Sequence, residues 1–282
     1  MRVQEALREG QRLLAAIDPG EAAIEAEALL RRALGLDRAR LYARLSDPLP
    51  AQDCRAFFAL VRRRLAREPL AYILGRREFY GLELEVTPAV AVPRPETELL
   101  VELALGWLRR QGDRPVLAAD VGTGSGAIAL ALAAHGPPGL RLLATDIEAA
   151  ALAVACRNAQ RLGLAGRVEF VRADLLSPFR GAFHLIVANL PYVPSAELEA
   201  APPEVKREPR LALDGGPDGL GIIARLLEQV PLLLAAGGLL LLEMAPSQAG
   251  ALAAMARRAL PTARIEVHCD LAGRQRVLTA WA

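Results

Sequence analysis

The first 75 residues repeat apolar side chains at the spacing of buried helix faces. Breaks at 18–20 (Asp-Pro-Gly) and 47–50 (Asp-Pro-Leu-Pro) separate the runs, and both segments are rich in turn-forming residues. The pattern predicts a small all-helical domain over residues 1–75. The apolar positions that define it are Leu7, Leu13, Leu14, Ile17, Ile24, Ala28, Leu29, Leu34, Phe57, Phe58, Val61 and Leu65.

Residues 76–95 show a different pattern, in which apolar positions alternate over short runs. Phe79, Leu82, Leu84 and Val86 are the apolar members. A period of two is typical of strands that bury one face. We predict a β-hairpin linker over residues 76–95, followed by a second domain over residues 96–282.

Residues 96–282 alternate strand-like apolar runs with helical stretches. The predicted strands are 116–121, 141–145, 168–171, 185–188, 239–242, 265–268 and 277–280. Strands separated by helices form parallel sheets covered on both faces, whereas the last two strands are too close for a crossover helix and should be antiparallel. The prediction is an α/β, Rossmann-like domain with a mostly parallel seven-stranded sheet.

The charges of the chain nearly balance, with 34 Lys and Arg against 32 Asp and Glu, a net charge of +2. A protein held on nucleic acid by phosphate contacts carries a strong positive field, so we expect no stable nucleic-acid binding. Cys54, Cys156 and Cys269 lie far apart and form no CxxC pair, which argues against a disulfide framework and structural zinc. We expect no metal and a reducing compartment.

Membrane and export signals are weak in this sequence. The first 20 residues mix acids with arginine and contain no unbroken apolar core, so we expect no signal peptide. The most apolar run, 232–242, is interrupted by Gly237 and Gly238 and is shorter than the ~20 residues of a spanning helix. We expect a soluble, cytoplasmic monomer that uses no membrane.

A glycine-rich loop at 120–126, Asp-Val-Gly-Thr-Gly-Ser-Gly, follows the first parallel strand and opens a helix. Glycines at that place let the backbone approach a ligand at the carboxyl edge of the sheet. The spacing fits a nicotinamide dinucleotide as well as S-adenosylmethionine. The candidate cofactor residues of the loop are Asp120, Gly122, Thr123, Gly124, Ser125 and Gly126.

Acidic residues follow the same strands. Asp146 ends the second strand, where a carboxylate bonds the ribose hydroxyls of an adenosine, and Asp174 with Leu175 follows the third, near the expected adenine amino group. Asp120 suits a cationic sulfonium better than a pyrophosphate, which it would repel. This favours S-adenosylmethionine.

Asn189, Leu190, Pro191 and Tyr192 follow the fourth strand and should face the same pocket as the glycine loop. The Asn189 side-chain oxygen and the Leu190 carbonyl offer two acceptors to a planar NH2 group, on whose face Tyr192 can pack. Such a nitrogen is a poor nucleophile, and acceptors that orient its protons lower the barrier to attack on an electrophilic methyl group. These four residues are the candidate catalytic set, and Asn189 is also a candidate cofactor-binding residue.

These motifs resemble those of amino-group methyltransferases with an Asn-Pro-Pro-Tyr motif, and more specifically the bacterial release factor glutamine methyltransferase (HemK/PrmC) family. The resemblance extends over nearly the whole chain. The further segments that carry it are 69–75, 93–98, 207–209, 214–219, 240–243 and 270–276.

The resemblance implies a class I methyltransferase fold and S-adenosylmethionine-dependent methylation of the glutamine N5 in the Gly-Gly-Gln tripeptide of class 1 peptide chain release factors. In the family the glycine loop and the acid after strand two hold the cofactor, and the Asn with the next carbonyl accepts from the glutamine amide. Residues 1–75 would dock the release factor. Leu190 departs from the pattern, because the family usually has proline there; the carbonyl is kept, but a locked φ angle is lost.

Other functions fit parts of the pattern. An N6-adenine methyltransferase could use the same pocket on a flipped base, and a ribosomal-protein glutamine is an alternative substrate. A cofactor-binding protein silenced at Leu190 and a nicotinamide dehydrogenase, which would leave 189–192 without a role, are the others. We interpret the arginines at 62, 63, 64 and 67 as a solvated helix face rather than a partner site, and Glu243 as structural.

Overall fold

The computed structural model describes residues 1–112 and 114–282. The chain divides into two compact units. The first contains Met1–Arg76 together with Pro202–Arg207, and the second contains Arg77–Ala201 together with Glu208–Ala282. The short return of the chain to the first unit at 202–207 has no counterpart in the sequence pattern.

The first unit is helical, with a core of leucine and phenylalanine side chains. Fully buried members include Leu14, Leu29, Leu41 and Phe57. Its elements are α1 (Val3–Leu14), α2 (Ala22–Leu34), α3 (Arg38–Ala43), α4 (Ala51–Leu65), α5 (Leu70–Leu74) and the 3-10 helix η2 (Val205–Arg207). Ile24, expected in the core, is 63% exposed, because the buried face of α2 runs one position further along the helix.

The residue after Ile24 belongs to a buried charged network. Glu25 is buried on α2, and Arg64 of α4 donates from Nε to both of its carboxylate oxygens at 2.9 Å. Arg64 also donates from Nη1 to Glu204 of the 202–207 segment at 2.8 Å, and Arg67 lies 2.9 Å from the same carboxylate. The interpretation of these arginines as a solvated face is therefore wrong for Arg64, whose side of α4 faces α2.

Replacing Arg64 with alanine should destabilise the protein by about 3–5 kcal/mol, since Glu25 and Glu204 would lose their shared cation inside the unit. Arg62 on the same helix is exposed and provides the matched control, for which Arg62→Ala should change stability by less than about 0.5 kcal/mol. Urea denaturation of the three proteins measures both. Equal effects of the two substitutions would contradict a structural role for Arg64.

The predicted hairpin is present as β1 (Arg76–Phe79) and β2 (Leu82–Glu85). Tyr80 and Gly81, the two residues between the strands, have φ angles of 49° and 76°, as a two-residue type I′ turn requires. Phe79 and Leu84 are buried in the core of the second unit.

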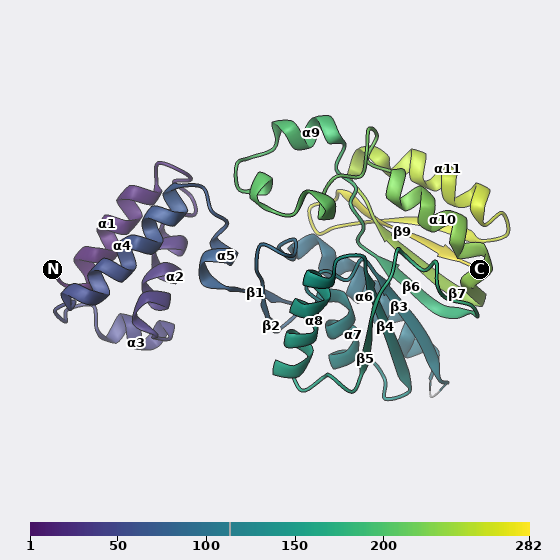
Figure 1. The fold of residues 1–282 in the computed structure, drawn as a ribbon, viewed down its shortest axis with the longest axis horizontal. Helices are drawn as coiled ribbons and strands as arrows, with labels where there is room; N and C mark the ends of the chain where they lie inside the picture. The colour runs from purple at the N-terminus through teal and green to yellow at the C-terminus, as the bar shows by residue number, and fades with distance from the viewer. Residues whose placement is uncertain (113) are drawn as a thin grey trace. The chain divides into compact units, whose positions relative to one another are not determined.

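The described residues of the second unit form a seven-stranded sheet in the order β5-β4-β3-β6-β7-β9-β8 (Figure 1). β9 is antiparallel to both of its neighbours, β7 and β8, and the remaining pairs are parallel. This confirms the predicted sheet, including its antiparallel end. The strands are β3 (Val116–Val121), β4 (Leu140–Asp146), β5 (Val168–Arg172), β6 (Phe183–Ala188), β7 (Leu234–Glu243), β8 (Arg264–Cys269) and β9 (Gln275–Trp281).

Helices cover both faces of this sheet (Figure 1). One core lies between the sheet and α6 (Glu98–Arg110), α7 (Ala127–His135) and α8 (Ala149–Arg161), and the other lies beneath α10 (Gly221–Leu233) and α11 (Ala249–Ala259). Neighbouring strand residues such as Leu241 and Leu242 enter opposite cores, so the central strands are apolar on both faces. The shorter elements are α9 (Ser195–Ala200), η1 (Pro95–Thr97), η3 (Arg210–Ala212) and η4 (Pro246–Gln248).

The register of the central strands determines where the loops with the predicted site residues leave the sheet. Val121 at the end of β3 is paired with Thr145 on β4 and with Ala188 on β6. The loops that follow these strands therefore leave one edge of the sheet side by side, where open α/β sheets bind ligands. Across the described residues, no helix combines the length and apolar character needed to cross a membrane.

Candidate active site

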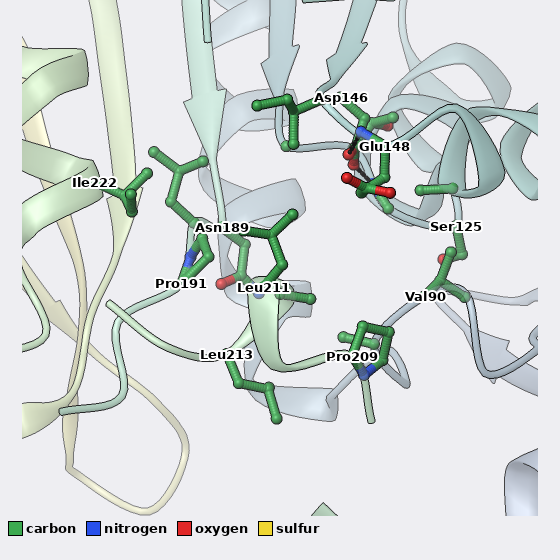
Figure 2. A pocket seen from close by; sticks show the side chains of 18 of the residues that line it. Val90, Ser125, Asp146, Glu148, Asn189, Pro191, Pro209, Leu211, Leu213 and Ile222 are labelled. Atoms are coloured by element: carbon green, nitrogen blue, oxygen red, sulfur yellow. Dashed lines mark hydrogen bonds between the residues drawn. The ribbon is translucent and has the colours of Figure 1, made fainter. Parts of the chain in front are cut away.

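A cavity of about 260 Å³ opens at this edge, within the second unit. Loops after β3, β4, β5 and β6 line it, together with residues 89–94 and Thr97 before α6. Pro209 and residues 211–213, in and around η3, also line it. Figure 2 shows Asp146 and Glu148 at one end of the pocket and Asn189 with Pro191 at the other. The cavity thus joins the predicted cofactor residues to the predicted catalytic motif.

The three glycines of the loop have positive φ angles and serve different purposes. A Cβ atom on Gly124 would meet no atom within 4 Å, so this glycine keeps the cavity wall open to a ligand. A Cβ on Gly122 would lie 2.8 Å from the Leu190 side chain. Gly126 does not line the cavity and instead lets α7 pack against Ala155 of α8.

Asp120 is fully buried and does not line the cavity. Its Oδ2 accepts from the Thr123 hydroxyl at 2.6 Å and from the Ala129 backbone N–H at 3.1 Å, so it braces the glycine loop against α7. Burial raises the pKa of Asp120 to about 6. The structure does not bring this carboxylate to the ligand surface, where the sequence placed it beside a sulfonium.

Asp146 lines the cavity and stabilises the loop at the same time. Its Oδ2 accepts from the Gly124 N–H and its Oδ1 from the Glu148 N–H, both at 2.9 Å. Burial raises the pKa of Asp146. Glu148 is a second acid on this wall; it lies only two residues further along, but no sequence motif singles it out.

Asp174 and Leu175 also line the cavity. Leu175 has a φ of 54°, which is uncommon for a residue with a side chain, and Asp174 pairs with Arg225 of α10 at 2.5 Å. Arg225 was not expected here, since the contact joins residues 51 positions apart.

All four residues of the 189–192 motif line the cavity. The Asn189 Nδ2 donates to the Thr97 hydroxyl oxygen at 3.0 Å, which leaves its Oδ1 as the acceptor end of the amide. Leu190 is buried, and its side chain covers Gly122. The Tyr192 hydroxyl donates to Oε1 of Glu243 at 3.1 Å, and burial followed by the nearby carboxylate raises the pKa of Tyr192.

Comparison with known proteins bears directly on this site. Residues 5–75 match the PrmC N-terminal domain and residues 118–208 match a methyltransferase domain. The release factor glutamine methyltransferase of Moorella thermoacetica is 45% identical over 100% of this chain and 99% of its own length. That of Cereibacter sphaeroides is 41% identical over 99% and 98%. The chain belongs to the release factor glutamine methyltransferase family.

Solved structures support the fold of this family member. A methyltransferase from Pyrococcus furiosus superposes with a TM-score of 0.53 at 17% identity, covering 80% of this chain and 97% of that one. The T. thermophilus 16S rRNA N2 G1207 methyltransferase in complex with AdoMet and guanosine gives 0.52 at 18% identity, covering 73% and 49%. Both comparisons bear out the class I methyltransferase fold.

The residues present fit S-adenosylmethionine. Gly124 leaves open space at the loop, Asp146 and Glu148 offer carboxylates to ribose hydroxyls, and Ile147 with Leu175 provides apolar surface for a base. Within residues 1–112 and 114–282, no three His, Cys, Asp or Glu side chains are grouped as a metal site.

Substituting Asp120 with asparagine should change how stability depends on pH. Because the folded pKa of about 6 exceeds the ordinary 3.8, the folded state keeps a proton that the unfolded chain releases. The free energy of unfolding therefore falls as pH rises from about 4 to about 6, by roughly 3 kcal/mol from this group. Urea denaturation between pH 4 and pH 7, without ligand, should show Asp120→Asn losing less stability than the parent. Parallel pH profiles would contradict the raised pKa.

Proposed function

We propose that this protein transfers a methyl group from S-adenosylmethionine to the side-chain N5 of the glutamine in the Gly-Gly-Gln tripeptide of class 1 peptide chain release factors. The observation that carries this proposal is the acceptor pair of Asn189 and Leu190, placed in one cavity with the glycine loop and Asp146. The family relationship supports the same substrate.

The chain's own residues supply orientation rather than a strong base. A primary amide is planar and presents two N–H donors, which suit the Asn189 Oδ1 and the Leu190 carbonyl. Bound S-adenosylmethionine supplies an electrophilic methyl group on a positively charged sulfur. The two acceptors hold the amide nitrogen in position and stabilise the positive character that it gains, after which one of its protons is acidic enough to pass to water without a dedicated base.

Apolar side chains complete the lining of the pocket. Pro191 lies beside Asn189, and Leu211 and Leu213 line the same cavity from the η3 segment (Figure 2). Leu211 lines this cavity and is also 52% exposed, so a protein substrate that enters the cavity can contact it. We assign these residues to the docking of the glutamine loop.

The remaining parts of the proposal concern partners. We expect residues 1–75 to dock the release factor and the enzyme to work as a monomer in the cytoplasm, where translation takes place. The near-zero net charge supports an enzyme without stable nucleic-acid binding. Adenine and ribosomal-protein glutamine are weaker candidates, because the full-length relatives are named for release factor glutamine.

The direct test incubates the purified protein and S-adenosylmethionine with a class 1 release factor and locates the added methyl group by peptide mass spectrometry. The expected result is one methyl group on the Gly-Gly-Gln glutamine. Controls are the glutamine-to-alanine release factor, unmethylated DNA and ribosomal proteins. Methylation of one of these controls instead would replace the proposed substrate.

Asn189→Ala should lower the rate of methyl transfer by about 100-fold or more, since it removes an acceptor aimed at the charge that develops on the amide. Binding of S-adenosylmethionine, measured by titration calorimetry, should change by less than about threefold because the loop and Asp146 are untouched. If affinity for the cofactor collapsed together with turnover, Asn189 would be a cofactor or folding residue instead.

A further inference from the structure

The chemistry of the pocket depends on which end of the Asn189 amide faces the substrate. The Asn189 oxygen would accept a hydrogen bond from the glutamine NH2. The Asn189 nitrogen carries only N–H donors, which would face the N–H donors of the glutamine and form no hydrogen bond with them. In the structure Nδ2 is turned away, toward the Thr97 hydroxyl oxygen at 3.0 Å. The neighbour that receives Nδ2 therefore decides the polarity of the pocket.

A hydroxyl group can enforce either orientation, because it both donates and accepts. Thr97 is 4% exposed and is the last residue of η1, directly before α6, and its backbone N–H donates to the Arg94 carbonyl. If its single hydroxyl proton points elsewhere, its oxygen accepts from Asn189 Nδ2. If that proton points at Asn189, the amide must turn round and present Nδ2 to the substrate.

Glu243 supplies the group that directs this proton. It is 1% exposed at the end of β7, and its Oε1 accepts from the Tyr192 hydroxyl. Its Oε2 is buried and, over residues 1–112 and 114–282, has no hydrogen bond of standard geometry. The Thr97 hydroxyl acts on the same carboxylate, lowering the pKa of Glu243. The buried Oε2 is thus the acceptor still available to Thr97, and because an ionised carboxylate only accepts, the hydroxyl is the donor wherever the two groups interact.

We propose that Glu243 is a positioning residue, which through Thr97 keeps the oxygen of Asn189 directed at the substrate amide and through Tyr192 fixes the opposite wall of the pocket. The order of donation runs from Asn189 Nδ2 to Thr97 and from Thr97 to Glu243. Glu243 touches neither substrate nor cofactor in this account. The proposal rests on the proposed function for the identity of the substrate, but the orientation of Asn189 is a property of the free protein.

The charged groups around Glu243 add a pH dependence. They are Tyr192 after β6, Glu96 in η1, and Arg276 on β9, which is bonded to Asp270 and lies 3.8 Å from Glu96. Burial dominates and raises the pKa of Glu243 to about 7. Below that pH the protonated carboxyl can donate to Thr97 and reverse the order, so kcat should rise as pH increases from 6 to 8.

The experiment compares Thr97→Val, Thr97→Ser and Glu243→Gln with the parent in full-length protein. Valine keeps the shape of threonine without the hydroxyl, and serine keeps the hydroxyl. Thr279→Val is the matched control, because Thr279 is a buried threonine whose hydroxyl bonds His268, outside the pocket. Steady-state kinetics on the release factor, calorimetric titration of S-adenosylmethionine and thermal unfolding are measured for each.

We expect kcat to be lowered about 10- to 100-fold in Thr97→Val and Glu243→Gln. A small misplacement of an orienting group slows the methyl transfer but has little effect on the affinity for S-adenosylmethionine. Affinity for S-adenosylmethionine should stay within about threefold, Thr97→Ser should recover most of kcat, and Thr279→Val should match the parent. The rise of kcat with pH should disappear in Glu243→Gln. A serine variant as slow as the valine variant, or parental kcat in Thr97→Val, would overturn the proposal.

A second measurement does not depend on the substrate. In ¹⁵N spectra of the free protein, the side-chain NH2 of Asn189 should shift with a midpoint near the Glu243 pKa of about 7, and this shift should vanish in Glu243→Gln. If the chemical shift of the Asn189 NH2 did not change with pH in the parent, the positioning role would be refuted, even if the release factor proved not to be the substrate. Failure to methylate the release factor with the shift intact would refute only the proposed function.

Discussion

The parallel pairing of β3 with β6 is the constraint on which the site depends. Val121 and Ala188 end these strands in register, so the glycine loop and Asn189 begin side by side. The Leu190 side chain packs against Gly122, so the loop after β6 contacts the glycine loop after β3. This contact leaves no room for a side chain at Gly122. Leu190 lacks the fixed φ angle of a proline, but its side chain is buried and packs over Gly122.

Carboxylates at the cavity fix the groups that face it: Asp120 and Glu243 lie buried behind the lining, and Asp146 is part of the lining. Asp120 holds Thr123 and the first turn of α7, Asp146 holds the Gly124 amide, and Glu243 holds the Tyr192 hydroxyl. Burial raises the pKa of all three, because a charge is harder to form away from water. Each carboxylate favours one arrangement of the hydrogen bonds around it. An amide nitrogen is a weak nucleophile, so methyl transfer to it depends on cavity groups that are held in one orientation.

The sequence predicted features that are local and missed those that depend on tertiary packing. The strands and the motifs at 120–126 and 189–192 follow from periodicity and from their places after strands, and the hairpin turn at Tyr80 and Gly81 is equally local. Thr97 and Glu243 meet Asn189 and Tyr192 only because elements distant in the chain pack together. Arg64 looked like a surface residue because its partners lie 39 and 140 residues away.

The central claim is that Asn189 and Leu190 bind a planar amide through two acceptors. A crystal structure with S-adenosylhomocysteine and a Gly-Gly-Gln peptide from a release factor tests it most directly. The account predicts that the glutamine side-chain nitrogen lies within hydrogen-bond distance of both the Asn189 Oδ1 and the Leu190 carbonyl oxygen, with Nδ2 still on Thr97. A glutamine amide bound away from these two oxygens, or an Asn189 that turns its nitrogen toward the peptide, would contradict the account.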